Sequence, residues 1–439
     1  MSASAPTAPA LAGSWGVSRG RAWWTVSLLG LLYILSFVDR VILALLVQPL
    51  KADLHVSDLQ LGLLFGPAFA VFYAVLGLPI ARLADRGNRK WLIVAGVLLW
   101  GLATVGSGFA VSLTQLIALR VGLAIGEAAL TPSAHSLIGD LFPPHRRPLA
   151  ASLYSALGMA GASGAYILGA FVIQTVKQAH LAGPIADLGP WRLVFILVGV
   201  PSVIGGLLVA FTTREPPRAL TAASAQLREL LAHLRSNLRL YVGLFGGAGL
   251  TQAVGYALVA WGPEFLRRHH GWTIQHAGYA LGLTGLAAGF GGTLAAPAIS
   301  RLLERRGRED GTVLVCIAGL AIGAGLAVAG PLQTSPYAFL GLAALASFCL
   351  TGVSNNVLVA MQLVAPARMR ATLVALLLMS ITLLGLGIGP AGVAMISTRF
   401  PAGGLGLGLS VLAGAVAVPA VLLLLWSRGR YAQLRRAAD

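Results

Sequence analysis

Four ionisable residues stand within stretches of sequence that are otherwise almost wholly apolar. Asp39 and Arg40 are adjacent in the first long apolar stretch, and Arg120 and Glu127 lie in the fourth. A charged side chain at the centre of a bilayer costs about 2.5–3.5 kcal/mol on insertion scales, so such residues are functional candidates. A carboxyl group in a low-dielectric cavity holds its proton tightly, and an approaching guanidinium loosens it. This chemistry predicts that Asp39 and Glu127 bind and release protons, with Arg40 and Arg120 tuning them.

The spacing of these residues places them at one level. At 1.5 Å per helical residue, Asp39 and Glu127 both fall near the middle of their stretches. Arg120 and Glu127 are seven residues apart and share one helix face, which Thr131 and His135 continue. Thr131 is predicted to contact substrate. The alternative for the charged group, a fixed buried salt-bridge network between two helices, stays open.

His135 has an imidazole that titrates near neutral pH, so it is a possible proton relay toward the cytoplasm. The alternative is an ordinary hydrogen-bonded histidine near the end of a helix.

The composition requires a membrane as the solvent. The chain has 439 residues, of which 57% are hydrophobic and 10% are charged, whereas soluble domains carry about 25% charged residues. Twelve stretches are long enough to cross a bilayer, which takes about 20 apolar residues each. We therefore expect an all-α membrane protein with twelve transmembrane helices.

The order of these stretches predicts two halves. A polar segment with an amphipathic pattern divides the chain, and each half carries a small-residue-rich helix, GMAGASG at 158–164 and GLGIGP at 385–390. Two pseudo-symmetric six-helix bundles with a substrate path between them are one known transporter plan. The predicted parts are a disordered cytoplasmic tail (1–22), an N-terminal six-helix bundle (23–211), a cytoplasmic linker (212–239), a C-terminal six-helix bundle (240–427) and a cytoplasmic tail (428–439).

Positive charge falls mainly on one side of the predicted spans. If the N-terminus lies inside, 23 of the 31 Lys and Arg residues lie in or beside inside loops and six lie outside. The positive-inside rule then predicts a multi-pass protein of the bacterial inner membrane with both termini cytoplasmic. The same distribution argues against nucleic acid as a partner, because the basic residues face anionic lipid.

The two cysteines, Cys316 and Cys349, lie in separate apolar stretches and form no zinc-binding spacing. We therefore expect no metal and no cofactor, and a chain that acts as a monomer.

The second half carries amides and aromatics where the first carries charges. Gln252 and Tyr256 are one helical turn apart on one face, and Asn355 and Asn356 lie in the tenth span. These four residues are predicted to bind substrate in the wall of a cavity. For the paired asparagines, hydrogen bonding between helices is an equal alternative.

Asp85 is unusual because it is an acid in a loop that the positive-inside rule fills with bases. It could cap the N-terminus of the helix that begins near Arg370 on the same side, since helix N-termini favour anions. This would be a reversible contact between the halves. Membrane anchoring accounts for the neighbouring Arg86 and Lys90.

The motif ARLADRGNRK at 81–90 and the segment RVGLAIGEA at 120–128 resemble the signatures of the major facilitator superfamily. Ser36-Phe-Val-Asp-Arg40 and GEAALTPSAHSLIGDLFP at 126–143 are similar to its spinster-like group. The resemblance implies the major facilitator fold, a proton-coupled carrier, and gating by the loop that holds Asp85 and Arg89. Two positions depart from the pattern: Ala81 stands where glycine is usual, and Ser300 where the second copy of the loop would carry an acid. The latch is therefore expected only in the first half.

These observations predict a proton-coupled secondary transporter that works by alternating access, binding protons, membrane lipid and a small-molecule or lipid substrate. The resemblance adds an expected cargo, an exported amphipathic solute of the lysophospholipid or sphingosine-phosphate type. A small organic anion or drug is the alternative cargo. An enzyme is not expected, since the outer loops hold no recognisable nucleophile–base or metal spacing. A receptor or scaffold would not need the buried charges.

Overall fold

The computed structural model describes residues 18–179, 188–217, 227–366, 368–400 and 404–436. Within these ranges the chain is helical, with no strand, and twelve helical segments are long and apolar enough to cross a membrane. The predicted fold class, twelve spans in two six-helix bundles, is confirmed.

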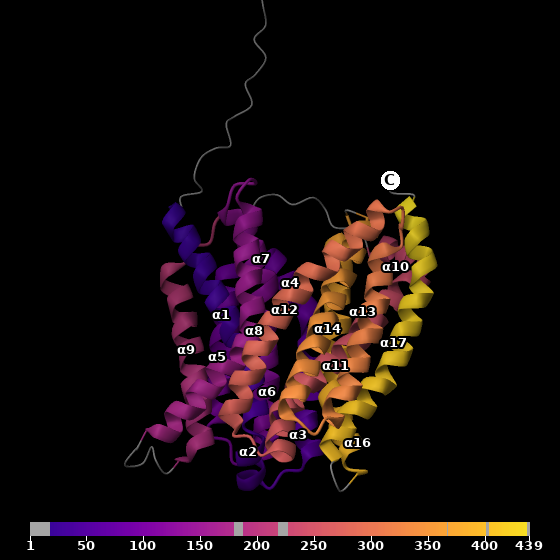
Figure 1. Ribbon diagram of the computed structural model, residues 1–439. Coiled ribbons are helices and arrows are strands. Elements are labelled where there is room, and N and C mark those ends of the chain that lie inside the picture. The colour runs from indigo at the N-terminus through magenta and orange to yellow at the C-terminus, as the bar shows by residue number, and fades with distance from the viewer. Residues whose placement is uncertain (1–17, 180–187, 218–226, 367, 401–403, 437–439) are drawn as a thin grey trace, which may run out of the picture.

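The N-terminal half occupies one side of the molecule and the C-terminal half the other (Figure 1). The spans of the N-terminal half are α1 (Arg19–Leu45), α3 with α4 (Asp58–Phe65 and Pro67–Arg86), α5 (Arg89–Ser107), α6 with α7 (Leu113–Ala128 and Leu130–Leu141), α8 (Arg147–Gln178) and α9 (Pro190–Thr212). Those of the C-terminal half are α11 (Leu238–His270), α12 (Ile274–Arg305), α13 with η2 (Gly311–Ala329 and Gly330–Leu332), α14 (Pro336–Val364), α15 with η3 and α16 (Arg370–Ser380, Ile381–Leu386 and Gly387–Ser397) and α17 (Gly404–Arg436).

Two short helices lie outside the spans, α2 (Val47–Leu54) and α10 (Leu227–Ser236). Helix α1 begins and α17 ends at the same end of the bundle, here called the terminal end; the opposite end, where α2 lies, is called the distal end (Figure 1).

Both predicted tails contain residues that are helical in the structure. Most of the tail 1–22 lies outside the described residues, and its last part is already helical, because Ser18 caps α1 by accepting a hydrogen bond from the N–H of Arg21. The predicted cytoplasmic tail 428–439 is helical up to Arg436, since α17 runs through it. Tyr431 is fully buried there and Leu434 packs against the core, so this end of the helix is held by tertiary contacts.

Small residues bring helices into close contact at equivalent places in the two halves. A Cβ added to Gly161 of α8 would lie 2.8 Å from the Cα of Ile34 in α1, and one added to Gly389 of α16 would lie 2.5 Å from the carbonyl oxygen of Ala253 in α11. Contacts of this length leave no room for a side chain, which explains both small-residue segments seen in the sequence.

The halves also touch each other tightly toward the distal end. A Cβ added to Gly62 of α3 would lie 2.9 Å from the carbonyl oxygen of Pro390 in α16. On the other side, a Cβ added to Gly278 of α12 would lie 2.9 Å from the Cβ of Ala170 in α8. The two halves are therefore closed against each other at this end by close packing of their helices.

The contact between α5 and α6 gives a test of this packing. A Cβ at Gly96 would lie 2.6 Å from the carbonyl oxygen of Gly126, whereas one at Gly139 of α7 would meet nothing within 4 Å. Overpacking a buried contact costs about 1–3 kcal/mol. Gly96→Val should therefore lower the thermal midpoint of the purified protein, while Gly139→Val should leave it almost unchanged. Equal midpoints for the two variants would contradict the packing described here.

Candidate functional site

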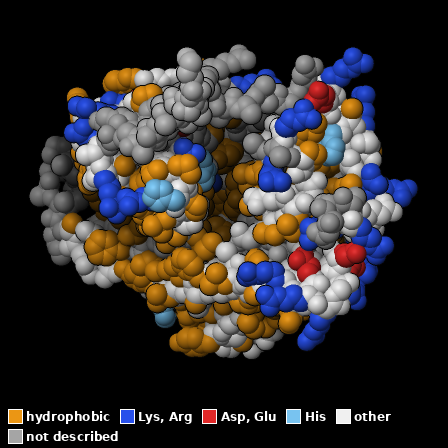
Figure 2. Space-filling view, turned by 90° about the horizontal axis from the view of Figure 1, so that it is seen from above, with side chains coloured by type: hydrophobic (Ala, Val, Ile, Leu, Met, Phe, Trp, Pro, Cys, Tyr) orange, Lys and Arg blue, Asp and Glu red, His pale blue; other side chains and the backbone are white. Residues whose placement is uncertain are grey.

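A large cavity lies between the two halves at mid-depth. It encloses about 1800 Å³ of empty space, its open mouth included, and is lined by α1, α4, α8, α11, α12 and α14 together with parts of α3, α6, η3 and α16. Seen from the terminal end, the molecule is hollowed between its halves, and hydrophobic side chains surround the hollow (Figure 2). The cavity therefore faces the terminal end.

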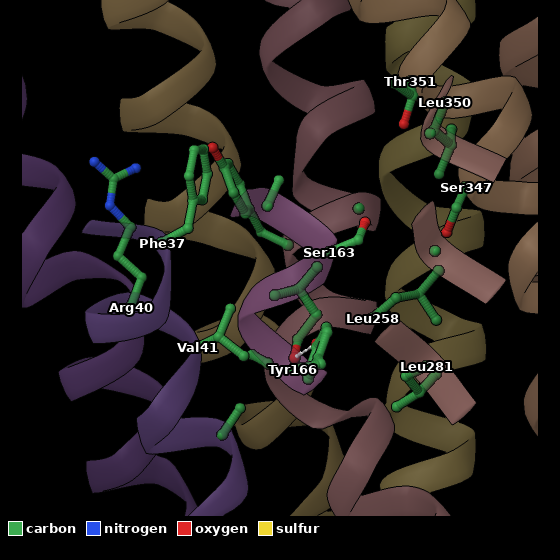
Figure 3. Close-up of a pocket in the computed structure, with 18 of the residues that line it drawn as sticks. Phe37, Arg40, Val41, Ser163, Tyr166, Leu258, Leu281, Ser347, Leu350 and Thr351 are labelled. Atoms are coloured by element: carbon green, nitrogen blue, oxygen red, sulfur yellow. Dashed lines mark hydrogen bonds between the residues drawn. The ribbon is translucent and has the colours of Figure 1, made fainter. Parts of the chain in front are cut away.

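The cavity wall is apolar with polar groups on two sides. Arg40 extends from α1 on one side, while the hydroxyls of Ser347 and Thr351 lie on the other (Figure 3). Phe37, Leu258 and Leu281 are among the apolar side chains between them. A ligand that fills this space would meet a cation, a long apolar surface and a set of hydroxyls.

Arg40 and Glu127 form an ion pair at the edge of the cavity. The Nε of Arg40 donates to Oε2 of Glu127 at 2.6 Å, and its Nη2 contacts the same oxygen. The Glu127 side chain is only 1% exposed, and its Oε1 has no hydrogen-bond partner among the described residues. The guanidinium carbon also lies 4.8 Å from the centre of the Phe69 ring, a cation–π contact. Arg40 is thus the member of the pair that reaches the cavity.

Arg120 makes a different kind of contact from the one predicted. Its Nη1 and Nη2 donate to the main-chain carbonyl oxygens of Asp39 and Arg40, at 3.1 and 3.4 Å. It forms no ion pair within the described part of the chain. Arg120 therefore fastens α6 to the backbone of α1, at the residues that carry the charged side chains.

Asp39 is buried and does not line the central cavity. Both of its carboxylate oxygens lack a hydrogen-bond partner in the described structure. They face a small separate space that Thr104, Ser107 and Arg120 also line. Asp39 thus lines this small space, whereas Glu127 is not among the lining residues of either space, and Arg120 borders both.

The predicted substrate residues of the C-terminal half separate into two groups. Gln252 and Tyr256 line the cavity, and Gln252 accepts a hydrogen bond of 2.9 Å from Ser354. Asn355 does not line it; its amide donates to Thr293 and to the carbonyl oxygen of Thr351.

Asn356 requires a correction. It is fully buried, and its amide donates to the Ser300 hydroxyl at 2.8 Å and to the carbonyl oxygen of Thr312 at 3.1 Å. Asn356 therefore joins α14 to α12 and α13. This agrees with the alternative stated for the paired asparagines, hydrogen bonding between helices. The same bond explains a serine at position 300, where a buried hydroxyl accepts from the amide.

Thr131 and His135 lie on α7 and are not among the lining residues of the central cavity. His135 is exposed, and its ring packs edge-on against Tyr154 at 5.1 Å between ring centres. The structure therefore does not bring either residue to the charged group.

The predicted gate residues lie at the terminal end, and two of them bind within their own halves. Arg89 is buried and pairs with Asp140 and, at 2.7 Å, with Glu215, so it ties α5 to α7 and to the segment after α9. Arg370 is exposed and donates to the carbonyl oxygen of Ala365 in its own half. The side chain of Asp85 is outside what the structure describes, so its latch stays a prediction.

The C-terminal half has its own ion pairs at this end. Arg428 and Arg308 donate to Asp310 at 2.5 and 3.2 Å. Partial burial acts to raise the pKa of Asp310, but the two guanidiniums outweigh it and lower that pKa. Like the pairs of Arg89, these contacts stay within one half.

The distal end, by contrast, carries an ion pair and a hydrogen bond between the halves. Arg268 of α11 holds Asp58 of α3 through two hydrogen bonds of 2.6 and 2.8 Å, and Lys51 of α2 donates to the same carboxylate at 2.7 Å. Glu264 of α11 accepts from Gln48 of α2 at 2.6 Å. We call these contacts the distal network, in which the Arg268–Asp58 ion pair joins the two halves.

Glu264 is the residue that the sequence analysis missed. The C-terminal spans are predicted to carry amides and aromatics in place of buried charge, but α11 extends to His270 and Glu264 within it is 1% exposed. Its carboxylate also accepts from Arg267, at 2.9 and 3.0 Å, and from Arg268. The spacing of Glu264 to these arginines, three and four residues, was the available signal.

Comparison with known proteins places this arrangement in a family. A family model described as Major Facilitator Superfamily matches residues 29–390. The chain is 33% identical over 292 residues to an "MFS-type efflux pump" of Mycolicibacterium smegmatis, covering 66% of this chain and 64% of that protein. It is 29% identical over 263 residues to human "Protein spinster homolog 1", covering 58% and 47%. A "Probable sulfoacetate transporter" of Cupriavidus necator is 26% identical over 291 residues, covering 63% and 64%. In each case the match spans less than two thirds of the relative.

Among solved structures, a bacterial homolog of the human lysosomal transporter spinster, described as inward-facing and unoccupied, superposes with a TM-score of 0.80 at 28% identity. The match covers 96% of this chain and 98% of that one. The D-xylose-proton symporter, at 16% identity and a TM-score of 0.69, shares the fold. The predicted resemblance to the spinster-like group is confirmed.

The distal network predicts the effect of removing one cation. Arg268→Gln removes charge-assisted hydrogen bonds that exist only while the distal end is closed, each worth about 1.5–3 kcal/mol. It should raise the distal-open population by roughly tenfold or more. The measurement is labelling of Ser347→Cys in the cavity, in a Cys316→Ala, Cys349→Ala background, by an impermeant thiol reagent added from the distal side.

Arg399→Gln is the matched control, because it removes an exposed arginine near the same end that forms no ion pair in the described structure. Equal labelling of both variants would show that the distal network does not hold the halves together.

Proposed function

Because the chain belongs to the major facilitator superfamily, we propose that it is a proton-coupled secondary active transporter that exports an amphipathic, lipid-like solute by alternating access. The observation that carries this proposal is the Arg40–Glu127 pair, which stands on the wall of a large, mainly apolar cavity. Glu127 can exchange a proton, and Arg40 can bind an anion. Proton and substrate can therefore act on the same contact.

The coupling step follows from that shared contact. When Glu127 takes up a proton it loses its charge, and the ion pair with Arg40 weakens. Export driven by an inward proton gradient requires the proton and the substrate to compete for this pair. A cationic group on the substrate head that contacts Glu127 would displace its proton, and a proton taken up on the other side would release that group. Linkage makes the two effects equal in free energy.

Asp39 would serve as a second proton carrier. Its buried carboxylate has no hydrogen-bond donor in the described structure to offset the loss of water, so its charge state depends on the position of Arg120. Arg120 is fixed to the α1 backbone at the residues that carry Asp39 and Arg40. A shift of α6 against α1 would change the electrostatics of both acids together.

Alternating access supplies the movement. In the present state the distal network and the α3–α16 and α8–α12 contacts close one end, and the cavity faces the other. Transport would require Arg268 and Asp58 to separate while new contacts form at the terminal end. Asp85, binding near the start of α15, is the proposed latch for that second state.

The cavity favours an amphipathic substrate over a small polar one. A long apolar wall between Arg40 and the Ser347 and Thr351 hydroxyls suits a lipid-like tail with a charged head. The name of the M. smegmatis relative, an efflux pump, agrees with export. A small organic anion or drug is the second candidate substrate. It is favoured by the sulfoacetate transporter among the relatives and by the Arg40–Glu127 ion pair beside the cavity.

We place the terminal end in the cytoplasm of a bacterial cell. The cluster Arg428, Arg430, Arg435 and Arg436 lies at that end, as do the basic residues near Arg89 and Arg308. This distribution satisfies the positive-inside rule for an inner-membrane protein. The present conformation is then inward-facing, and the distal network is an outer gate.

The proton carriers can be tested by neutral replacements. Asp39→Asn and Glu127→Gln should each abolish uptake of labelled lysophospholipid driven by a pH gradient in proteoliposomes, because neither side chain can then exchange a proton. Both variants should stay folded. Transport with an unchanged response to pH would contradict the assignment. Loss of folded protein would favour the structural network, since breaking a buried pair costs about 3–5 kcal/mol.

The cavity wall can be tested separately from coupling. Tyr256→Ala removes a large lining side chain and should weaken substrate binding by about tenfold, the effect of losing roughly 1.5 kcal/mol of buried contact. Proton coupling should be retained. Asn356→Ala is the comparison, because Asn356 lies off the cavity and should alter thermal stability instead. A Tyr256 variant with normal binding and a proton leak would contradict this division.

A further inference from the structure

A second cavity opens at the distal end, separate from the central one. It encloses about 880 Å³ of empty space, its mouth included, and lies between the ends of α1, α8 and α11 and the starts of α9 and α12, beside α2. Its lining comes from both halves of the chain. We call it the distal pocket.

The distal pocket carries an excess of positive charge. Among the described residues, two cations line it, Lys177 at the end of α8 and Arg267 at the end of α11, against a single acid, Glu264. Lys177 is exposed and makes no ion pair within the described part of the chain. Glu264 pairs with Arg267 of the same pocket and with Arg268 of the distal network, so it leaves Lys177 without a counter-charge among the described residues. A bound anion would therefore complete the charge balance of this pocket.

Two helix N-termini add to the preference of this pocket for an anion. The pocket is lined by Pro190 and Trp191, which begin α9, and by Thr273 and Ile274 at the start of α12. Pro190 has no N–H and Thr273 caps the N–H of His276, so what these ends offer an anion is the half positive charge of a helix N-terminus. Two such ends in one pocket, together with two basic side chains, favour an anion such as a phosphate group.

The rest of the lining is suited to a hydrocarbon chain. Leu45, Ile173, Val176, Val194 and Ile274 form an apolar wall, and Trp191 and Trp272 border it. Tryptophan and basic side chains at the end of a membrane span are typical of the level of lipid head groups. The pocket thus combines a cationic, head-group-level end with an apolar side.

We propose that the distal pocket binds one anionic phospholipid of the surrounding membrane. Its phosphate would lie between Lys177 and Arg267, near the starts of α9 and α12, and an acyl chain would follow the apolar wall. This site is distinct from the central cavity, and it does not depend on the identity of the transported cargo.

The proposal has a conformational consequence. Lys177 belongs to the N-terminal half and Arg267 to the C-terminal half, so the site is whole only while the distal ends are together. A ligand that binds one state better than another stabilises that state. An anionic phospholipid in the distal pocket would therefore favour the closed distal end.

The test uses the full-length purified chain in detergent, with phosphatidylglycerol and phosphatidylcholine of identical acyl chains as probes. Native mass spectrometry counts the lipid molecules retained. One phosphatidylglycerol should bind in preference to phosphatidylcholine and raise the thermal midpoint. Lys177→Gln should weaken this binding about fivefold, the effect of one basic residue near a lipid head group. Arg399→Gln, the matched change outside the pocket, should have no effect.

A second variant and a competing anion distinguish a phospholipid site from a site for any small anion. Ile274→Trp fills the apolar wall without altering charge, and it should also reduce phosphatidylglycerol retention. Millimolar inorganic phosphate should not displace the lipid. The proposal is overturned if Lys177→Gln and Arg399→Gln behave alike, if phosphatidylcholine binds equally well, if Ile274→Trp has no effect, or if phosphate displaces the lipid. A Lys177→Gln variant whose lipid-free midpoint matches the parent rules out misfolding.

Discussion

A charge inside a membrane span must be matched by a partner or by a function, because the surrounding lipid offers neither water nor hydrogen bonds. In the N-terminal half this constraint gathers Asp39, Arg40, Arg120 and Glu127 where α1 meets α6. Only Arg40 and Glu127 pair through their side chains in the described structure. Arg120 instead satisfies part of its donor capacity on the carbonyl oxygens of α1. The group is therefore incompletely matched, with unused acceptors on both acids, and that leaves room for a proton or an anion to change its state.

The position of α1 and α6 depends in turn on packing between small residues. Gly161 lets α8 approach α1, and Gly96 and Gly126 let α5 approach α6. The equivalent contact of Gly389 with α11 holds the opposite wall of the cavity. In lipid, where apolar burial provides little drive for helix association, such close contacts supply much of the attraction between helices.

The two ends of the molecule are held together by different means. At the distal end, side chains from both halves share Asp58 and Glu264, and close helix packing lies beneath them. At the terminal end, the described ion pairs of Arg89 and Asp310 remain inside their own halves. Under the alternating access proposed above, a network that crosses between the halves would exist in one conformation only, whereas pairs within a half would persist in both. The distal network can therefore bias the conformational equilibrium, and the terminal pairs preserve the shape of each bundle.

Much of the architecture follows from the order of residues alone. Span length, hydropathy and the small-residue segments are local properties, so the twelve spans, the two halves and the superfamily resemblance were predictable and are confirmed. The similar depth expected for Asp39 and Glu127 also follows from the sequence, because depth along a helix scales with residue count.

Only the tertiary structure decides which side chains meet. The direction of a side chain depends on how each helix is rotated against its neighbours, and this depends on packing across distant segments. For this reason the sequence could not show that Asp39 faces away from the cavity, that Asn356 joins three helices, or that Glu264 meets Gln48 216 positions earlier.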